Sequence, residues 1–148
     1  MNSYILKKSI IINRNSSKFL IPEVHLTKKY KPDLVGFDKN SKKTFAYEIK
    51  VNKYDLLNDI KMFQYSKYVN YTYLVITKDL LDIAIDKIKD SSIGLIIPYY
   101  EGNKLKISSY KKVKNNNNPL LSYEEIKEKC LFSAYWKMEK YLLNNFVS

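Results

Sequence analysis

Hydrophobic residues recur with a period of two in some segments of the chain and with a helical period in others. Strands are predicted at residues 18–26, 32–38, 43–51, 71–77, 92–100 and 104–110, of which 71–77 is a continuous hydrophobic run typical of a buried central strand. The helical period predicts helices at 52–69, 79–90 and 122–145. Residues 3–13 fit either a helix or a strand, because they contain a run of β-branched isoleucines. The order of elements predicts an α/β protein whose mixed β-sheet is flanked by helices.

Polar residues mark the beginnings of two of these helices. Asn52 with Asp55, and Ser122 with Glu125, have the spacing at which the first side chain caps the helix and the acidic residue bonds back to it. Both helices are therefore predicted to begin at these positions.

The asparagine-rich segment 111–121 is predicted to be an exposed linker. It separates an α/β body at residues 1–110 from the C-terminal helix at 122–145, and the whole is expected to form one domain. That helix can either cover the sheet or mediate dimerisation. Its hydrophobic stripe consists of Ile126, Leu131, Ala134, Tyr135, Met138, Tyr141 and Leu142.

Composition and charge narrow the class of protein. The chain has 148 residues, a net charge of +11 and a single cysteine, Cys130, which we expect in the core. One cysteine excludes an intramolecular disulfide and a cysteine-rich zinc site and fits a reduced, cytoplasmic compartment. No segment is hydrophobic over the length that spans a bilayer, so we expect no membrane partner. The excess of positive charge favours nucleic acid as the partner, although lysine-rich composition alone produces part of it.

Three charged residues stand out around the strands at 32–38 and 43–51. Asp33 follows Pro32 where the first strand begins, and Glu48 and Lys50 share one face of the second. If the strands are neighbours, the two carboxylates meet, and close carboxylates repel unless a proton or a cation lies between them. Mg²⁺ or Mn²⁺ fits, with the backbone carbonyl of Ile49 as a further ligand. Lys50 would then lie beside the attacking water.

The motif Pro32-Asp33 followed by Glu48-Ile49-Lys50 resembles the PD-(D/E)XK nuclease superfamily. The segment from Glu48 onward, with the later Gly-Leu-Ile strand, is similar to the MmcB-like group of DNA-repair proteins, although the approach to Asp33 lacks that group's arginines. The resemblance implies a restriction-endonuclease-like fold and Mg²⁺- or Mn²⁺-dependent cleavage of phosphodiester bonds.

The resemblance also implies further site residues. Glu23 matches an upstream acidic position that completes the metal site, with a surface glutamate as the alternative. Gln64 belongs to a Q-x-x-x-Y pattern and would point toward the sheet if residues 52–69 form one helix. On that helix Asp59 faces away from Gln64, and its expected role is structural. Residues expected to contact nucleic acid are Lys28, Lys29, Lys31, Lys53, Lys61 and Tyr68.

We therefore expect a metal-dependent nuclease that acts on DNA in repair, recombination, or phage- or defence-related processing. The alternative is a catalytically inactive nuclease-fold module that binds DNA or protein. RNA as the substrate, endonucleolytic or exonucleolytic cleavage, and a homodimer or a protein partner all stay open at this point.

Overall fold

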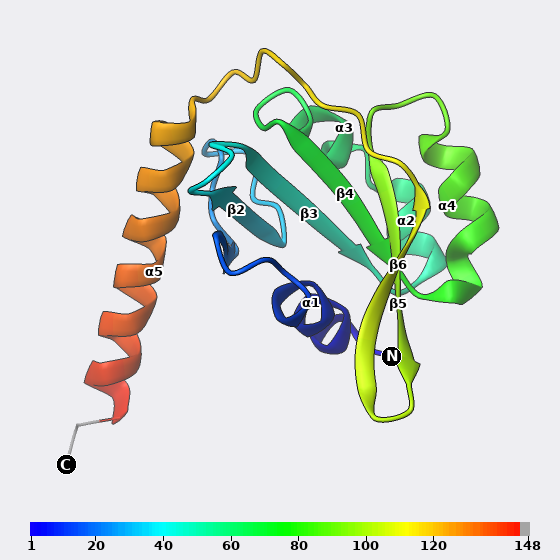
Figure 1. Cartoon of the computed structure of the whole chain (residues 1–148), viewed down its shortest axis with the longest axis horizontal. Coiled ribbons are helices and arrows are strands. Elements are labelled where there is room, and N and C mark those ends of the chain that lie inside the picture. The colour runs from blue at the N-terminus through cyan, green and yellow to red at the C-terminus, as the bar shows by residue number, and fades with distance from the viewer. Residues whose placement is uncertain (146–148) are drawn as a thin grey trace.

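A six-stranded mixed β-sheet forms the centre of the protein, and its strands lie side by side in the order in which they occur in the chain. The structure is a computed structural model and describes residues 1–145. Figure 1 shows this sheet between helices, so the predicted α/β fold class is confirmed. The strands are β1 (Lys18–Pro22), β2 (Leu34–Asp38), β3 (Thr44–Lys50), β4 (Tyr71–Ile76), β5 (Gly94–Glu101) and β6 (Lys104–Lys111).

The helices differ from the prediction in two places. Residues 3–13 form a helix, in which Leu6 and Ile10 are buried one turn apart. The helix predicted at 52–69 is wrong, because the chain breaks into two short helices at Asp59. The helices are α1 (Ser3–Ile12), α2 (Lys53–Asn58), α3 (Lys61–Tyr65), the 3₁₀ helix η1 (Lys78–Leu80), α4 (Leu81–Ile88) and α5 (Tyr123–Asn145).

The carboxyl ends of β3, β4 and β5 lie at one edge of the sheet, because these strands are parallel. β1, β2 and β3 are antiparallel neighbours, whereas β3, β4 and β5 run parallel. Parallel neighbours need crossover connections, and α2 with α3 supplies the first of them. Lys50, at the end of β3, is the register partner of Ile76, at the end of β4. Loops and helix starts that follow these strands therefore gather at the same edge.

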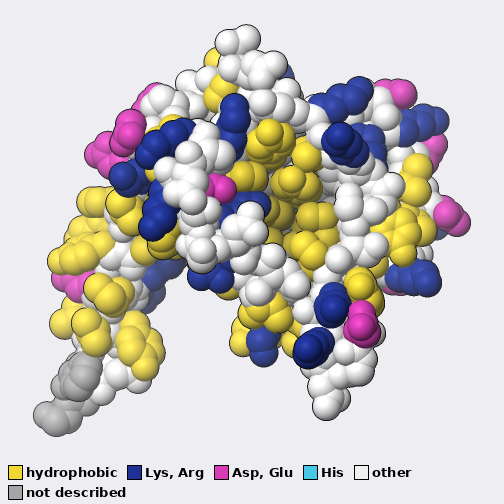
Figure 2. Space-filling view, in the orientation of Figure 1, with side chains coloured by type: hydrophobic (Ala, Val, Ile, Leu, Met, Phe, Trp, Pro, Cys, Tyr) yellow, Lys and Arg dark blue, Asp and Glu magenta, His cyan; other side chains and the backbone are white. Residues whose placement is uncertain are grey.

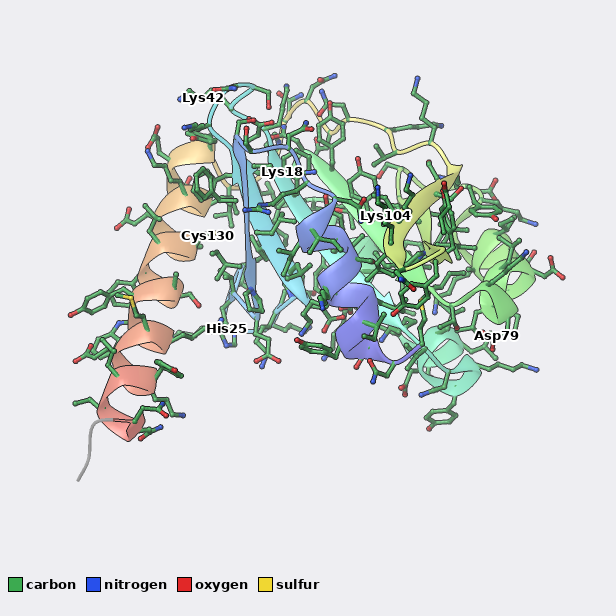
Figure 3. The ribbon with its side chains drawn as sticks, turned by 60° about the horizontal axis from the view of Figure 1, so that its bottom comes forward. Lys18, His25, Lys42, Asp79, Lys104 and Cys130 are labelled. Atoms are coloured by element: carbon green, nitrogen blue, oxygen red, sulfur yellow. The ribbon has the colours of Figure 1, made fainter. Side chains whose placement is uncertain are left out.

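Each face of the sheet has its own hydrophobic core. α1 covers one face, where Leu6 and Ile10 pack against residues such as Leu34. Lys18 lies on this face (Figure 3). Its amino group donates a 2.7 Å hydrogen bond to the hydroxyl of Tyr47. The other face is covered by α2, α3, α4 and the first turns of α5.

The predicted helix caps are confirmed. The Asn52 side chain accepts a 2.9 Å hydrogen bond from the backbone N–H of Asp55. At α5 the pair is reciprocal: the Ser122 hydroxyl accepts from the N–H of Glu125, and the Glu125 carboxylate accepts from the N–H of Ser122, both at 3.1 Å. Each bond satisfies an N–H group that the first turn of a helix leaves without a partner.

α5 packs on the body through one face, at positions from Ile126 to Lys137. Ile126 is buried, and so is Cys130, as predicted, whose thiol lies 3.7 Å from the carbonyl oxygen of Val35. Farther along, the helix runs past the sheet, as Figure 1 shows at left. Within residues 1–145, none of the helices combines the length and the hydrophobicity needed to cross a membrane.

Candidate functional site

The carboxylates of Asp33 and Glu48 belong to facing positions of β2 and β3. Leu34 pairs with Tyr47 in the antiparallel register, which places Asp33, one residue earlier, opposite Glu48. Side chains at facing positions project from the same face with their Cβ atoms about 5 Å apart. The Asp33 carboxylate also accepts a 2.6 Å hydrogen bond from the backbone N–H of Ile49. This bond holds one of its oxygens against β3.

Glu48 is a buried carboxyl group surrounded by other acids. Its exposed fraction is 6%. Burial, followed by the neighbouring carboxylates of Asp33 and Asp59, raises the pKa of Glu48 to about 10. The Tyr65 hydroxyl lies 3.4 Å from a Glu48 carboxylate oxygen and donates to it. At neutral pH the carboxyl group is therefore protonated unless a cation takes the place of the proton.

Lys50 lies on the same face of β3 and forms an ion pair with Asp59. The Lys50 Nζ and an Asp59 carboxylate oxygen are 2.6 Å apart, and both side chains are largely buried. Burial alone would lower the pKa of Lys50, but the neighbouring acidic groups raise it overall, chiefly through the hydrogen bond to Asp59. Lys50 thus carries its charge, and Asp59 holds its amino group in place.

The break between α2 and α3 is what brings Asp59 to this position. Asp59 has an extended backbone, with φ −89° and ψ 119°, and its second carboxylate oxygen accepts a 2.8 Å hydrogen bond from the N–H of Lys61. An aspartate that bonds to a nearby N–H in this way competes with helix continuation. A continuous helix would have turned Asp59 away from the site, as predicted. The expectation that Asp59 is only structural therefore rested on a helix that does not form.

These side chains open into a shared cavity of about 500 Å³ at the carboxyl end of β3. Its charged lining includes Asp33, Glu48, Lys50 and Asp59, together with Lys31 and Lys61. The cavity is also lined by Ile49, Asp55, Asn58, Ile60 and Tyr65. A buried carboxyl group with a strongly raised pKa next to a specific charged partner is typical of functional sites.

Other residues predicted for the site lie elsewhere. Glu23 is exposed beyond the end of β1, with a left-handed backbone at φ 55°, and its charge faces Lys137 of α5. Gln64 is half-buried and does not line the cavity, because the break after α2 changes the direction of α3. Its neighbour Tyr65 reaches Glu48 instead. Tyr68 packs against Tyr30, with ring centroids 5.9 Å apart.

The remaining predicted nucleic-acid contacts are exposed lysines. Lys28, Lys29 and Lys53 are exposed but do not line the cavity, unlike Lys31 and Lys61. The sequence alone did not identify Tyr65, which contacts Glu48, or the ion pair of Asp59 with Lys50. The available signal for Asp59 was its residue type: an aspartate in the interior of the helix predicted at 52–69 competes with the backbone for hydrogen bonds and disfavours helix.

The residues present fit a divalent cation held by few protein ligands. Within residues 1–145, no group of three His, Cys, Asp or Glu side chains has the arrangement of a complete metal site. Mg²⁺, however, is commonly bound by one or two carboxylates together with waters and substrate phosphate. Asp33 and Glu48 provide such a pair. Burial, followed by the neighbouring carboxylates, disfavours a negative charge on Glu48, and a cation between the two groups would offset both effects. Ile49, whose N–H bonds to Asp33, also lines the cavity.

Replacing Asp59 with Asn is expected to lower the pKa of Lys50, because the hydrogen bond and charge that raise it are lost. A side-chain NMR titration of Lys50 would measure this. Stability should fall by about 1 kcal/mol, because the ion pair with Lys50 is lost. Asp55→Asn, which also removes a carboxylate from the cavity lining, is the control and should leave the Lys50 titration unchanged. An unshifted titration in the Asp59 variant would contradict this arrangement.

Comparisons with known proteins establish the fold without a function. No protein-family model and no curated protein sequence matches the chain. The chain is similar in structure to a protein of unknown function from Silicibacter pomeroyi, with a TM-score of 0.77 and 11% sequence identity. The similarity covers 100% of this chain and 96% of that one. The arrangement of elements therefore recurs in a solved structure.

Proposed function

We propose that the protein is a metal-dependent nuclease that hydrolyses phosphodiester bonds in DNA, with its active site at Asp33, Glu48 and Lys50. The observation that carries the proposal is the convergence of two facing carboxylates and a buried, charged lysine in one open cavity. A cation bound by the carboxylates would polarise the scissile phosphate and lower the pKa of the attacking water. This chemistry agrees with the resemblance of the Pro32-Asp33 and Glu48-Ile49-Lys50 motif to PD-(D/E)XK nucleases.

The protein's own residues have distinct roles in this proposal. Asp33 and Glu48 hold the cation, and the N–H of Ile49 orients Asp33. Lys50 is a charged donor beside the reacting phosphate, where it orients the water and stabilises the developing negative charge. Asp59 is a positioning residue, because it acts through Lys50. As water attacks phosphorus, it gives up one proton and forms the new P–O bond, while the bond to the leaving sugar oxygen breaks and that oxygen takes up one proton.

Lysines that line the cavity or are close to its lining residues in sequence support nucleic acid as the substrate. Lys31 and Lys61 line the cavity. Lys28, Lys29 and Lys53 are exposed and lie within a few residues of lining residues in the sequence. Contacts from lysine to phosphate give affinity with little sequence preference and a strong dependence on salt. The net charge of +11 acts in the same direction.

The alternative function is a nuclease-fold module that binds DNA or protein without cleaving it. Two observations favour it. The Lys50 amino group is already engaged by Asp59, and the described part of the chain contains no complete set of three metal-binding side chains. This alternative predicts salt-sensitive DNA binding that is indifferent to Mg²⁺.

The test is incubation of the purified protein with supercoiled, linear and single-stranded DNA and with RNA, in Mg²⁺, Mn²⁺ or EDTA. We expect cleavage that requires the metal and is lost in Lys50→Met, which keeps the length of the side chain but removes its charge. Lys89→Ala is the control, because Lys89 is an exposed lysine whose ion pair is with Asp86. Absence of metal-dependent cleavage, or equal cleavage by the Lys50 variant, would refute the assignment.

A further inference from the structure

The distal part of α5 exposes an unusual number of large hydrophobic side chains. Their exposed fractions lie between 43% and 64%. Figure 2 shows hydrophobic atoms gathered on this projecting part of the helix, at lower left. The residues are Leu131, Phe132, Tyr135, Trp136, Met138, Tyr141, Leu142 and Leu143.

Four of these residues form a continuous seam that faces away from the body. Leu131, Tyr135, Met138 and Leu142 follow one another at intervals of four, three and four residues, which is the spacing of a coiled-coil contact. The body contacts of α5 are made by Ile126, Cys130 and Lys137, which donates to the carbonyl of Pro22. At about 100° per residue, the seam points roughly 130° away from these contacts. It is therefore free to pack against another helix.

Charge argues against nucleic acid as the occupant of the seam. α5 contains four glutamates and four lysines, so the net charge of +11 belongs to the rest of the chain. Glu124 and Glu128 lie on the outward side of the helix near the seam, where they would repel phosphates. Because α5 has no net charge, two copies of this strongly basic protein can approach one another through it without strong repulsion.

The exposed area is sufficient for a stable contact. Six of the eight residues lie in the seam or directly beside it: Leu131, Phe132, Tyr135, Met138, Tyr141 and Leu142. At roughly 200 Å² for each fully exposed large side chain, six that are about half exposed amount to on the order of 600 Å². Two copies would together bury about 1,200 Å², which is the lower end of the range for specific, stable protein–protein interfaces.

We propose that the distal half of α5 is a homodimer interface in which two α5 helices pack antiparallel along the seam. The spacing of the seam is the same in both directions, so each of its layers is filled: Leu131 faces Leu142 of the second copy, and Tyr135 faces Met138. The methionine sulfur against the tyrosine ring is a favourable contact. Such a pairing is isologous and closes at two copies.

The antiparallel direction follows from where the charge lies. Each basic body packs on α5 between Ile126 and Lys137. Antiparallel helices displace the two bodies from one another along the pair, whereas parallel helices place them directly side by side, where their charges repel. Antiparallel helix dipoles also attract one another.

Molar mass in solution tests the interface. The wild-type protein is expected to have twice the mass of one chain in light scattering and sedimentation velocity. Leu142→Glu, in the seam, should give the monomer with unchanged circular dichroism. Leu143→Glu is the matched control: it places the same charge one residue farther, outside the seam, and should stay dimeric. A monomeric wild type, or equal behaviour of the two variants, would overturn the proposal.

Disulfide cross-linking tests the direction. Leu131 and Leu142 meet across the dimer only if the helices are antiparallel. A chain with Leu131→Cys and Leu142→Cys together should then cross-link on oxidation, whereas each single variant should not. Single variants that cross-link to themselves would overturn the antiparallel arrangement. Wild-type protein serves as the control for Cys130, which is buried. Neither experiment uses catalytic activity, so the dimer and the proposed nuclease can fail independently.

Discussion

Asp33→Asn is expected to reduce metal-dependent DNA cleavage by roughly 10³-fold, the equivalent of about 4 kcal/mol in the barrier, without unfolding the protein. Asn keeps a side-chain oxygen that can accept from the N–H of Ile49, the bond that Asp33 makes at 2.6 Å. It removes only the negative charge that would hold the cation. The loss of activity is then attributable to the charge.

Asp33→Ala provides the comparison. Alanine removes the acceptor as well, which leaves the N–H of Ile49 without its partner and should cost a further 1–3 kcal/mol of stability. We therefore expect both variants to be inactive but only the alanine variant to be clearly destabilised, as measured by cleavage rates and chemical denaturation. An Asn variant that cleaves at the wild-type rate would exclude Asp33 as a metal ligand.

Glu48→Gln is expected to abolish cleavage and, in EDTA, to stabilise the fold. The folded protein raises the pKa of Glu48 from its ordinary value of 4.5 to about 10, chiefly by burial. Between these values the folded state binds more protons than the unfolded state, so this group's contribution to stability falls as the pH rises. Gln does not titrate. The free energy of unfolding of the Gln variant should therefore exceed that of the wild type by an amount that grows with pH above 4.5, to on the order of 2 kcal/mol at pH 7.

Denaturation in EDTA from pH 5 to pH 9 would measure this difference. Over that range Asp59 stays ionised, because its hydrogen bonds and the charge of Lys50 outweigh burial and lower its pKa. Mg²⁺ should then stabilise the wild type but not the Gln variant, since a ligand that binds the folded state adds to its stability. A Gln variant that is less stable than the wild type at pH 9 would contradict the buried, protonated state of Glu48.

Local patterns predicted the parts of the site that lie on strands. A strand alternates its side chains between two faces, so Glu48 and Lys50 had to share a face wherever β3 was placed. The pairing with Asp33 followed from adjacent strands joined by a short turn, and the structure has that register. The helix caps at Asn52 and Ser122 were equally local.

The parts that depended on continuous helical geometry were not predictable in the same way. A helical period at 52–69 assumes that every residue adds the same rotation, and one extended residue at Asp59 removes that relation. As a result Asp59 and Tyr65 reach the cavity and Gln64 does not. The helical period at 52–69 could not indicate the ion pair between Asp59 and Lys50, because Lys50 belongs to β3.

The sequence by itself determined the fold class, the strand faces and the joint position of Asp33, Glu48 and Lys50, because these follow from the geometry of neighbouring residues and neighbouring strands. Only the tertiary structure decided that Glu23 faces α5 rather than the site, that Asp59 positions Lys50, and that the α5 seam stays uncovered. These outcomes depend on where whole elements pack against one another. That packing is a balance of burial and charge over many residues, and no short pattern in the chain encodes it.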